Sequence, residues 1–152
     1  MQILIFEWLT GGGLWIDGVS FHCGAAIRSQ GKRMLQAIAQ DFLIAGIEVI
    51  LPIDERSIGD FPAVDGLTLW PVSSQVDLGD FLKNLAKDVD RILLIAPETG
   101  ARLLNCVQWL ESFREKFLSP VEEFVRIASS KQASFNFLQA QGFDGVSRGM
   151  EF

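Results

Sequence analysis

The sequence predicts an α/β fold built around a parallel, doubly wound sheet. Short apolar runs, which are typical of buried strands, alternate with segments whose apolar residues recur at helical spacing. This alternation predicts four strands, joined by right-handed crossovers. With 152 residues, of which 49% are apolar and 21% charged, the chain is long enough for one domain with a substantial core and too short for two.

The first part of the chain predicts two strands and one helix. Gln2–Phe6 is a near-continuous apolar run, and a long loop is expected over residues 10–30. Helical periodicity follows over residues 34–45, and a glycine ends that helix. The second strand is expected at Glu48–Leu51, where Pro52 closes it.

The middle of the chain continues the alternation. Leu67–Val72 is a weaker third strand, and its proline suggests an edge or an end of the sheet. Apolar spacing predicts helices over residues 78–85 and 103–113, and between them Arg91–Ala96 is the clearest strand of all.

The last part predicts two helices. After a short strand or coil at residues 117–118, Ser119–Glu122 has the form of a capping box with proline at the first helical position. The helix that it begins is expected to end near Ala128. A final helix is expected from about Ser130 to Gln141.

Composition excludes several classes of protein. The net charge is −6 and no cluster of Lys and Arg occurs along the sequence, which argues against nucleic acid or an anionic membrane as the main partner. No apolar run approaches the ~18–20 residues of a membrane helix, and Met1–Phe6 lacks the basic start of a signal peptide. Cys23, Cys106 and the single His22 match no zinc-site spacing, so we expect reduced thiols in a cytoplasmic protein and no metal site.

Three polar or glycine-rich segments follow predicted strands, where the ligand crevice of such sheets lies. The candidate substrate-binding residues in them are Glu7, Thr10, Gly11, Gly12, Gly13, Asp54, Arg56, Pro97, Glu98 and Thr99. Glu7 and Glu98 would line one crevice, which suits an amine or another cationic group. The alternative for a carboxylate at the end of a buried strand is a salt bridge, for example from Glu7 to Arg56.

The remaining features of the crevice have two interpretations each. The spacing of Gly11–Gly13 is not that of a phosphate-binding loop, so we expect a flexible loop over a substrate, or else a solvated turn. The Asp54–Arg56 segment holds a substrate by charge, or is itself a solvated turn. Trp8 and Trp15 are packing residues, or they flank a ligand.

Several motifs together resemble the N-terminal part of ATP-grasp carboxylate–amine ligases. They are ILIFEWLTGGG, the GxxML…DF helix, EVILPIDER, ILLIAPETG and SPxEFVxIASSKQASFNFLQAQGFxGV, which together span essentially the whole chain. The Pro97-Glu98 and Ser130-Lys131 pairs resemble glycinamide ribonucleotide synthetase. The opening FEWLTGGG is more similar to the tyramine–glutamate ligase-like branch, which is associated with methanofuran-type cofactor biosynthesis.

The resemblance implies a preATP-grasp domain over residues 1–128, a Rossmann-like parallel sheet of four to five strands flanked by helices. Residues 129–152 would be a helix and turn that lead into a missing ATP-grasp domain. The family places Glu7, Thr10–Gly13 and Pro97–Thr99 on the acceptor-substrate crevice, and the lysine at the position of Lys131 reaches ATP phosphates. Many relatives have aspartate where this chain has Ser130, and the proline often found after the turn at residues 145–148 is missing.

The resemblance also implies ATP and magnesium as cofactors of a full-length enzyme that joins a small carboxylate and an amine or amino acid. The glycine-rich lid and the acidic magnesium ligands of the family are missing from this chain, so we assign it no catalytic or metal residue and expect it to be inactive alone. Apolar residues near the end, Phe135, Phe137, Leu138 and Phe143, predict self-association. The alternatives are a free-standing module that binds a small ligand and an interaction protein that dimerises through these helices.

Overall fold

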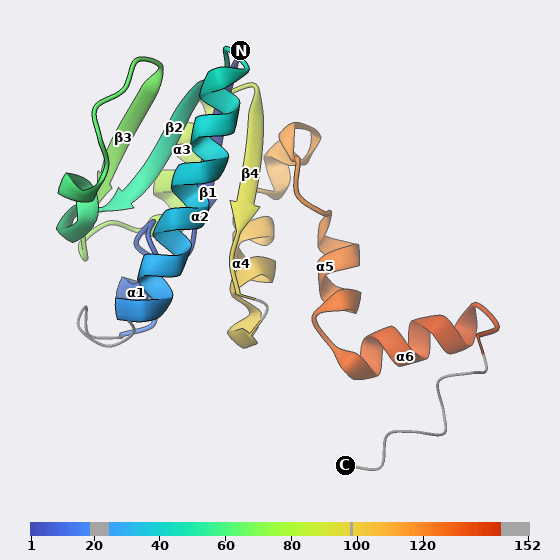
Figure 1. Cartoon of the computed structure of the whole chain (residues 1–152). Coiled ribbons are helices and arrows are strands. Elements are labelled where there is room, and N and C mark those ends of the chain that lie inside the picture. The colour runs from blue at the N-terminus through green and yellow to red at the C-terminus, as the bar shows by residue number, and fades with distance from the viewer. Residues whose placement is uncertain (19–24, 98, 144–152) are drawn as a thin grey trace.

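The structure, a computed structural model, describes residues 1–18, 25–97 and 99–143 and confirms the α/β fold (Figure 1). It contains one four-stranded sheet in the order β3-β2-β1-β4, in which every neighbouring pair is parallel. The strands are β1 (Gln2–Glu7), β2 (Glu48–Asp54), β3 (Leu67–Val72) and β4 (Arg91–Ile95). The strand order reverses at β1, so the topological switch point lies between β1 and β4.

Helices cover both faces of the sheet (Figure 1). α2 (Ala25–Ile44) lies on one face, and α3 (Leu78–Asp88) and α4 (Arg102–Trp109) lie on the other. Successive residues of β1 therefore enter different cores: Ile3 and Ile5 pack beneath α2, whereas Leu4 and Phe6 pack beneath α3 and α4. Burial on both faces explains why the strands are near-continuous apolar runs.

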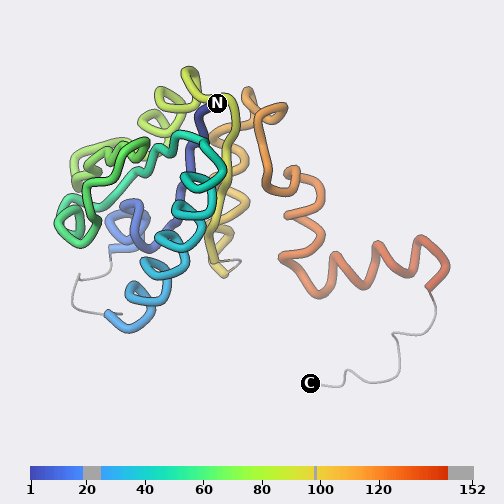
Figure 2. The backbone as a smooth tube through the Cα atoms, turned by 45° about the horizontal axis from the view of Figure 1, so that its top comes forward, coloured from blue at the N-terminus to red at the C-terminus, as the bar shows by residue number. Residues whose placement is uncertain are grey.

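Shorter elements complete the chain. α1 (Gly13–Ile16) follows β1, and three 3₁₀ segments are η1 (Glu55–Asp60), η2 (Thr99–Ala101) and η3 (Glu111–Lys116). α5 (Glu122–Ala128) and α6 (Lys131–Ala140) lie beside the sheet beyond β4, and α6 lies far from β3, as both views show (Figures 1 and 2). Ser130 caps α6 by accepting a hydrogen bond from the backbone N–H of Ala133, so the predicted last helix is confirmed.

The long loop predicted over residues 10–30 is wrong in its extent. α1 begins at Gly13, the last residue of the glycine run, and α2 begins at Ala25, well before the first apolar residue of its expected periodicity. The first turns of α2 carry mainly polar residues, so hydrophobic spacing gave no signal there. α2 ends as predicted, with Gly46 in the left-handed conformation at φ +75°.

Pro52 does not close the second strand but lies within β2. The pairing of β1 with β2 ends at Leu4 and Ile50, and beyond that point β2 pairs with β3 alone. Pro52 therefore lies where no hydrogen bond to β1 is needed, and its missing N–H costs no ladder bond. Two residues later the Asp54 N–H donates to the carbonyl of Thr10 at 2.7 Å, so the loop after β1 takes the place of the diverging strand.

The predicted capping box at Ser119–Glu122 is also wrong. α5 begins at Glu122 after Val121, without a side-chain cap. The Ser119 hydroxyl instead accepts a hydrogen bond from the Leu94 N–H at 2.7 Å and donates to the Leu94 carbonyl at 3.2 Å. Just before it, Phe117 forms an isolated parallel bridge with Ile92. Ser119 therefore binds the edge of β4 and does not cap α5. The short strand or coil expected at residues 117–118 forms a single bridge to β4.

Candidate functional site

Glu7 ends β1 with its carboxylate turned inward. Only 2% of the residue is exposed. One carboxylate oxygen accepts a hydrogen bond from the Leu9 N–H at 3.1 Å, and the other accepts bonds from the N–H and the hydroxyl of Thr10, both at 2.8 Å. Burial raises the pKa of Glu7, and the hydrogen bonds from Thr10 and Leu9 oppose that shift. The carboxylate therefore holds the turn after β1 in place.

The glycine run after β1 is buried, so it is not the solvated turn that the sequence offered as an alternative, whereas a flexible loop over a substrate stays a prediction. A Cβ atom at Gly11 would lie 2.6 Å from the ring of Phe6, and one at Gly13 would lie 2.4 Å from the ring of Trp8. Gly12 adopts φ +98° immediately before α1. The glycines are needed because the backbone passes directly over two aromatic side chains, with one residue in a left-handed conformation.

The Asp54–Arg56 segment after β2 is an ordered ion pair and not a solvated turn. Asp54 is only 1% exposed, and its carboxylate accepts from the backbone N–H of Arg56 at 3.0 Å and from the Arg56 Nε at 2.8 Å. The guanidinium carbon of Arg56 lies 3.4 Å from the centre of the Trp15 ring. Arg56 is thereby held between a buried carboxylate and an aromatic face. Arg56 therefore forms its salt bridge with Asp54 and not with Glu7, which was the alternative that the sequence offered.

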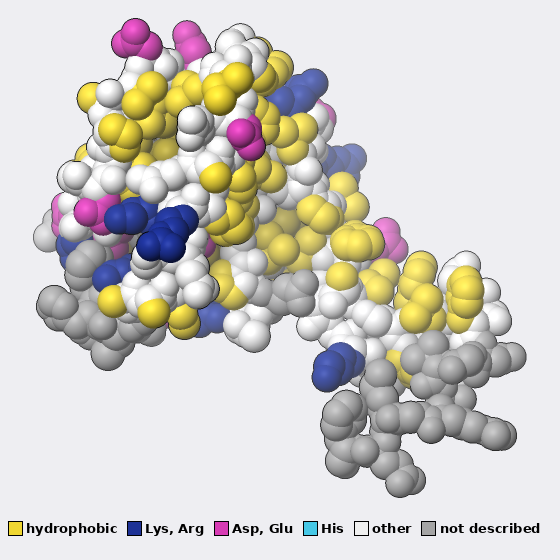
Figure 3. All heavy atoms as spheres, viewed as in Figure 1, with side chains coloured by type: hydrophobic (Ala, Val, Ile, Leu, Met, Phe, Trp, Pro, Cys, Tyr) yellow, Lys and Arg dark blue, Asp and Glu magenta, His cyan; other side chains and the backbone are white. Residues whose placement is uncertain are grey.

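A polar pocket of about 240 Å³ opens at the carboxyl ends of β1 and β2. It lies between the first turns of α2, the loop after β1 and η1. Its lining consists of Thr10, Ala25, Arg28, Ser29, Lys32, Arg56, Ser57 and Asp60. Lys32 pairs with Asp60 at 3.2 Å across the rim of the pocket. Figure 3 shows basic side chains gathered over the lower half of α2, with acidic side chains beside them.

A larger groove of about 430 Å³ lies further along the same face of the sheet. It is lined mainly by apolar side chains, among them Leu43, Leu51, Phe61 and Leu67. None of the predicted site residues lines it. The polar pocket is therefore the candidate site, since it combines predicted residues with several convergent charged groups.

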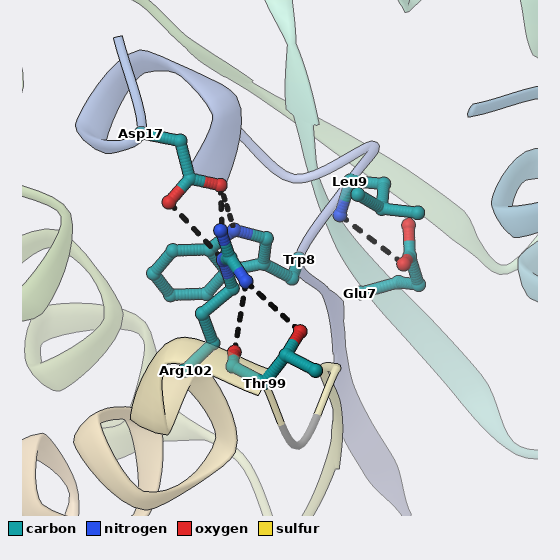
Figure 4. A network of polar contacts seen from close by, with 6 residues as sticks. All are labelled: Glu7, Trp8, Leu9, Asp17, Thr99 and Arg102. Carbon is teal, nitrogen blue, oxygen red and sulfur yellow. Dashed lines mark hydrogen bonds and ion pairs between the residues drawn. The ribbon is translucent and has the colours of Figure 1, made fainter. Parts of the chain in front are cut away.

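A second polar network lies on the β4 side of the switch point (Figure 4). The carboxylate of Asp17 accepts hydrogen bonds from the Trp8 indole at 3.0 Å and from the Arg102 Nε at 3.0 Å. A further Arg102 nitrogen donates to the carbonyl of Thr99 at 2.8 Å and to its hydroxyl at 3.2 Å. Trp8 also stacks on Trp109 in the core. This network ties the loop after β1 to the loop after β4.

The structure divides the predicted site residues between these places. Thr10 and Arg56 line the polar pocket, Glu7 and Asp54 are buried behind them, and Thr99 belongs to the network of Asp17 and Arg102. Pro97 precedes that network and is partly buried, whereas Glu98 lies outside the described residues. That Glu7 and Glu98 line one crevice therefore stays a prediction.

Lys131 is exposed and is the first residue of α6. That helix lies away from the carboxyl ends of β1 and β2 in both views (Figures 1 and 2). α6 packs on α5, which in turn packs on α4. The structure therefore does not bring Lys131 into the polar pocket. Its predicted contact with ATP phosphates would belong to a separate place in the protein and stays a prediction.

Sequence reasoning missed Arg28, Lys32, Asp17 and Arg102. Arg28 was assigned to a loop, although Arg28 and Lys32 have the i, i+4 spacing that places two side chains on one face of a helix. Recognising that α2 begins before its apolar stripe would have revealed this pair. Asp17 and Arg102 are 85 positions apart, and no local pattern indicates their ion pair.

In the part of the chain that the structure describes, no helix is long and apolar enough to cross a membrane. In the same ranges, no three or more His, Cys, Asp or Glu side chains are grouped so that they could hold a metal ion.

Comparison with known proteins agrees with this architecture. A crystal structure of a protein from Archaeoglobus fulgidus, described as a member of the ATP-grasp superfamily, matches with a TM-score of 0.67 at 18% sequence identity. The match covers 92% of this chain and 40% of that one, so this chain spans less than half the length of the larger protein. At this level of identity the likeness concerns the fold. No curated protein sequence matches significantly.

The sequence itself matches a family model described as the pre ATP-grasp 3 domain over residues 47–125. This region extends from the start of β2 to α5 and includes Asp54, Arg56, Pro97 and Thr99. Because the match covers just over half of the sequence, and the fold agrees with that of an ATP-grasp superfamily structure, the chain belongs to the pre ATP-grasp 3 domain family.

Proposed function

We propose that this chain is the substrate-binding domain of an ATP-dependent ligase that joins a carboxylate to an amine. In such a reaction the carboxylate attacks the γ-phosphate of ATP and forms an acyl phosphate and ADP. The amine then attacks the acyl carbon and releases phosphate. The observation that carries the proposal is the polar pocket at the carboxyl ends of β1 and β2 in a preATP-grasp sheet.

The contribution of this domain would be to position a substrate, because its charged residues are held in a rigid frame. Thr10 is fixed by its bonds to Glu7, and Arg56 is fixed by Asp54 and Trp15. Groups held in this way keep a reacting partner in place without large losses of side-chain freedom on binding. The tyramine–glutamate ligase-like opening, FEWLTGGG, supports an amine or amino acid as that partner.

A panel of amines and amino acids tests substrate binding through the thermal stability of the chain. A ligand at about 100 times its Kd should stabilise the folded state by roughly 2.7 kcal/mol. Ser57→Phe should abolish the effect, because a phenyl ring would fill the pocket, whereas Ser74→Phe on an exposed turn should not. If no member of the panel stabilises the chain, or if both variants behave alike, this pocket is not the substrate site.

We further propose that the chain alone does not catalyse ligation, since the resemblance assigns it none of the magnesium ligands that the family uses. Calorimetric titration with Mg-ATP should show no binding. Lys131→Ala provides the control, because the resemblance assigns Lys131 to the ATP phosphates. Binding that disappears in Lys131→Ala would mean that a nucleotide site is already complete in this chain and would refute the proposed inactivity.

A role in association is supported by the apolar surface of the C-terminal helices. Phe124 is 60% exposed on α5, Phe137 is 46% exposed on α6, and Phe143 is 61% exposed just beyond α6. α5 and α6 pack on one another, and exposed aromatic side chains on neighbouring helices can form a contact surface. We expect the chain to self-associate in sedimentation experiments and Phe137→Ser to weaken that association, whereas Ile44→Ser on α2 should not. A strictly monomeric chain at high concentration would contradict this.

A further inference from the structure

We infer that the polar pocket and the larger apolar groove form one elongated site for an amphiphilic substrate, whose polar head lies in the pocket and whose apolar tail lies in the groove. This inference rests on the proposed function, because it names the class of substrate that the same site binds. Three features support it: the two cavities adjoin, their linings differ in polarity, and the contacts between them are weak.

The two cavities lie end to end between the same two segments of the chain. Lys32 of the polar pocket and Gln36 of the apolar groove are one turn apart on α2. On the opposite wall Asp60 ends η1 and lines the pocket, and the next residue, Phe61, lines the groove. The α2 residues that line the two cavities span positions 25–43, which corresponds to about 27 Å of helix. The cavities therefore adjoin along both walls.

The two linings match the two ends of an amphiphile. In the polar pocket every lining residue except Ala25 has a polar side chain. Among the described residues no charged one lines the groove, and its lining residues Ala39, Leu51 and Phe61 are at most 7% exposed. Figure 3 shows apolar side chains on the upper part of this face, above the basic side chains over the lower half of α2. A tail in the groove is therefore removed from water while the head keeps polar partners.

Ion pairs compensate charges at the polar end. Lys32 pairs with Asp60, and Arg56 pairs with Asp54. The hydroxyl group of Ser57 can donate or accept a hydrogen bond. Such a lining suits a head that itself donates and accepts, as an amino acid does. The groove is therefore the part of the site that discriminates between substrates with similar heads.

The contacts between the two cavities are exposed. Lys32 Nζ lies 3.2 Å from the Asp60 carboxylate, and the Gln36 side-chain amide donates to the Asp60 carbonyl at 3.2 Å. The side chains of Lys32 and Asp60 are 31% and 54% exposed. Because exposed pairs of this kind contribute little to stability, a substrate tail can displace them or pass over them at small cost.

The volumes are consistent with a single shared site. The polar pocket of about 240 Å³ is smaller than the ~300–1,000 Å³ that is typical of pockets for drug-sized ligands. The adjoining groove of about 430 Å³ lies within that range. The pocket alone holds a head group, and the groove adds the apolar contact area that a small substrate needs in order to bind well.

Titration of the labelled 152-residue chain with two homologous series tests this site by backbone amide NMR. The probes are n-alkylamines from ethylamine to decylamine and linear α-amino acids from alanine to 2-aminodecanoic acid, each kept below its micelle concentration. Members whose tail is too short to pass Lys32 should bind alike. Beyond that length, the Kd of at least one series should fall about two- to fourfold per methylene, with shifts at Val64 and Leu67. A Kd that does not change with tail length in either series would overturn the inference.

Charged variants at the rim of the groove locate the tail. Val64 lines the groove and is 46% exposed, so Val64→Asp should abolish the gain with tail length and leave the fold intact. Val121→Asp is the matched control, because Val121 is 55% exposed and lines neither cavity. Gln40→Glu repeats the test on the α2 wall, with Gln30→Glu as its exposed control. Persistence of the gain in both groove variants, or its equal loss in the controls, would overturn the inference.

Sedimentation of the same variants tests the competing occupant of the groove, which is a second copy of the chain. If Val64→Asp weakens self-association and Val121→Asp does not, the groove is a contact between copies and the inference is overturned. Amide spectra of each variant show whether it remains folded.

Ser57→Phe separates this inference from the proposed function. Tail-dependent binding should disappear in Ser57→Phe, since the head would lose its place in the polar pocket. Tail-dependent binding that persists in this variant would place the ligand in the groove alone and would overturn the elongated site. Short members that bind and are lost in Ser57→Phe, without any gain from longer tails, would refute the elongated site and leave the proposed substrate-binding role standing.

Discussion

Gly31 lies in α2 directly against the buried carboxyl group of Glu7, and its replacement by alanine tests the geometry of this site. A Cβ atom at this position would lie 2.9 Å from the Glu7 Oε2 and 3.1 Å from its carboxyl carbon. The carboxyl group has little room to retreat, because its oxygens accept bonds from Leu9 and Thr10 at 2.8–3.1 Å. The added methyl group must therefore displace the helix or break one of these bonds.

Two opposing effects set the magnitude for Gly31→Ala. Alanine is favoured over glycine inside a helix by about 1 kcal/mol, which alone would stabilise the protein. Overpacking of a filled site costs about 1–3 kcal/mol. The free energy of unfolding should therefore fall by about 1 kcal/mol, within a range of about 0–2 kcal/mol. The melting temperature should fall by roughly 2–4 °C for each kcal/mol of unfolding free energy lost in a chain of this length.

Urea unfolding followed by the fluorescence of the four tryptophans measures this difference. Gly59→Ala is the control, because a Cβ atom there meets nothing within 4 Å, and its effect should stay within about 0.5 kcal/mol or be slightly stabilising. If Gly31→Ala stabilised the chain by the full helix-propensity gain, the contact between α2 and the Glu7 carboxyl group would not exist as described.

Three further predictions concern ionisable groups. Burial raises the pKa of Glu7 above its ordinary 4.5, so the stability that Glu7 contributes is fully present below pH 4.5 and is lost as pH rises through the raised pKa. The stability of Glu7→Gln relative to wild type, measured by urea unfolding, should therefore increase with pH across this interval. A difference that stays constant with pH would argue against the raised pKa. A double-mutant cycle of Asp17→Asn and Arg102→Gln should give a coupling energy of about 1–2 kcal/mol, above the ~0.2–1 kcal/mol of exposed pairs, and additive effects would mean that the ion pair does not hold the two loops together. Burial raises the pKa of Cys106 to about 12, so in a Cys23→Ser background a thiol reagent at mildly alkaline pH should react only after the chain unfolds, and rapid reaction of the folded chain would contradict its burial.

The candidate site was predictable only where it follows directly from strand order. Polar residues after buried strands meet at one edge of a parallel sheet, and this rule correctly placed Thr10 and Arg56 near one another. The same rule counted Glu7 and Asp54 among the residues that line the crevice itself. Both are nearly completely buried, because the loop after β1 folds back onto β2 through the bond from Asp54 to Thr10. That bond depends on where β1 and β2 diverge, which the sequence pattern does not indicate.

The hydrophobic pattern of this chain was sufficient for the α/β class and the positions of the four strands, because burial on both faces demands continuous apolar runs. Its motifs also led to the family that the comparisons show. The tertiary structure alone decided how the charges are distributed. Arg28 on α2 and Arg56 on η1 are separated along the chain by β2, yet both line one pocket. Asp17 in the loop after β1 forms an ion pair with Arg102 at the start of α4. Crossover geometry and packing bring such residues together, and local periodicity carries no information about either. The polar pocket could therefore be identified only from the folded chain.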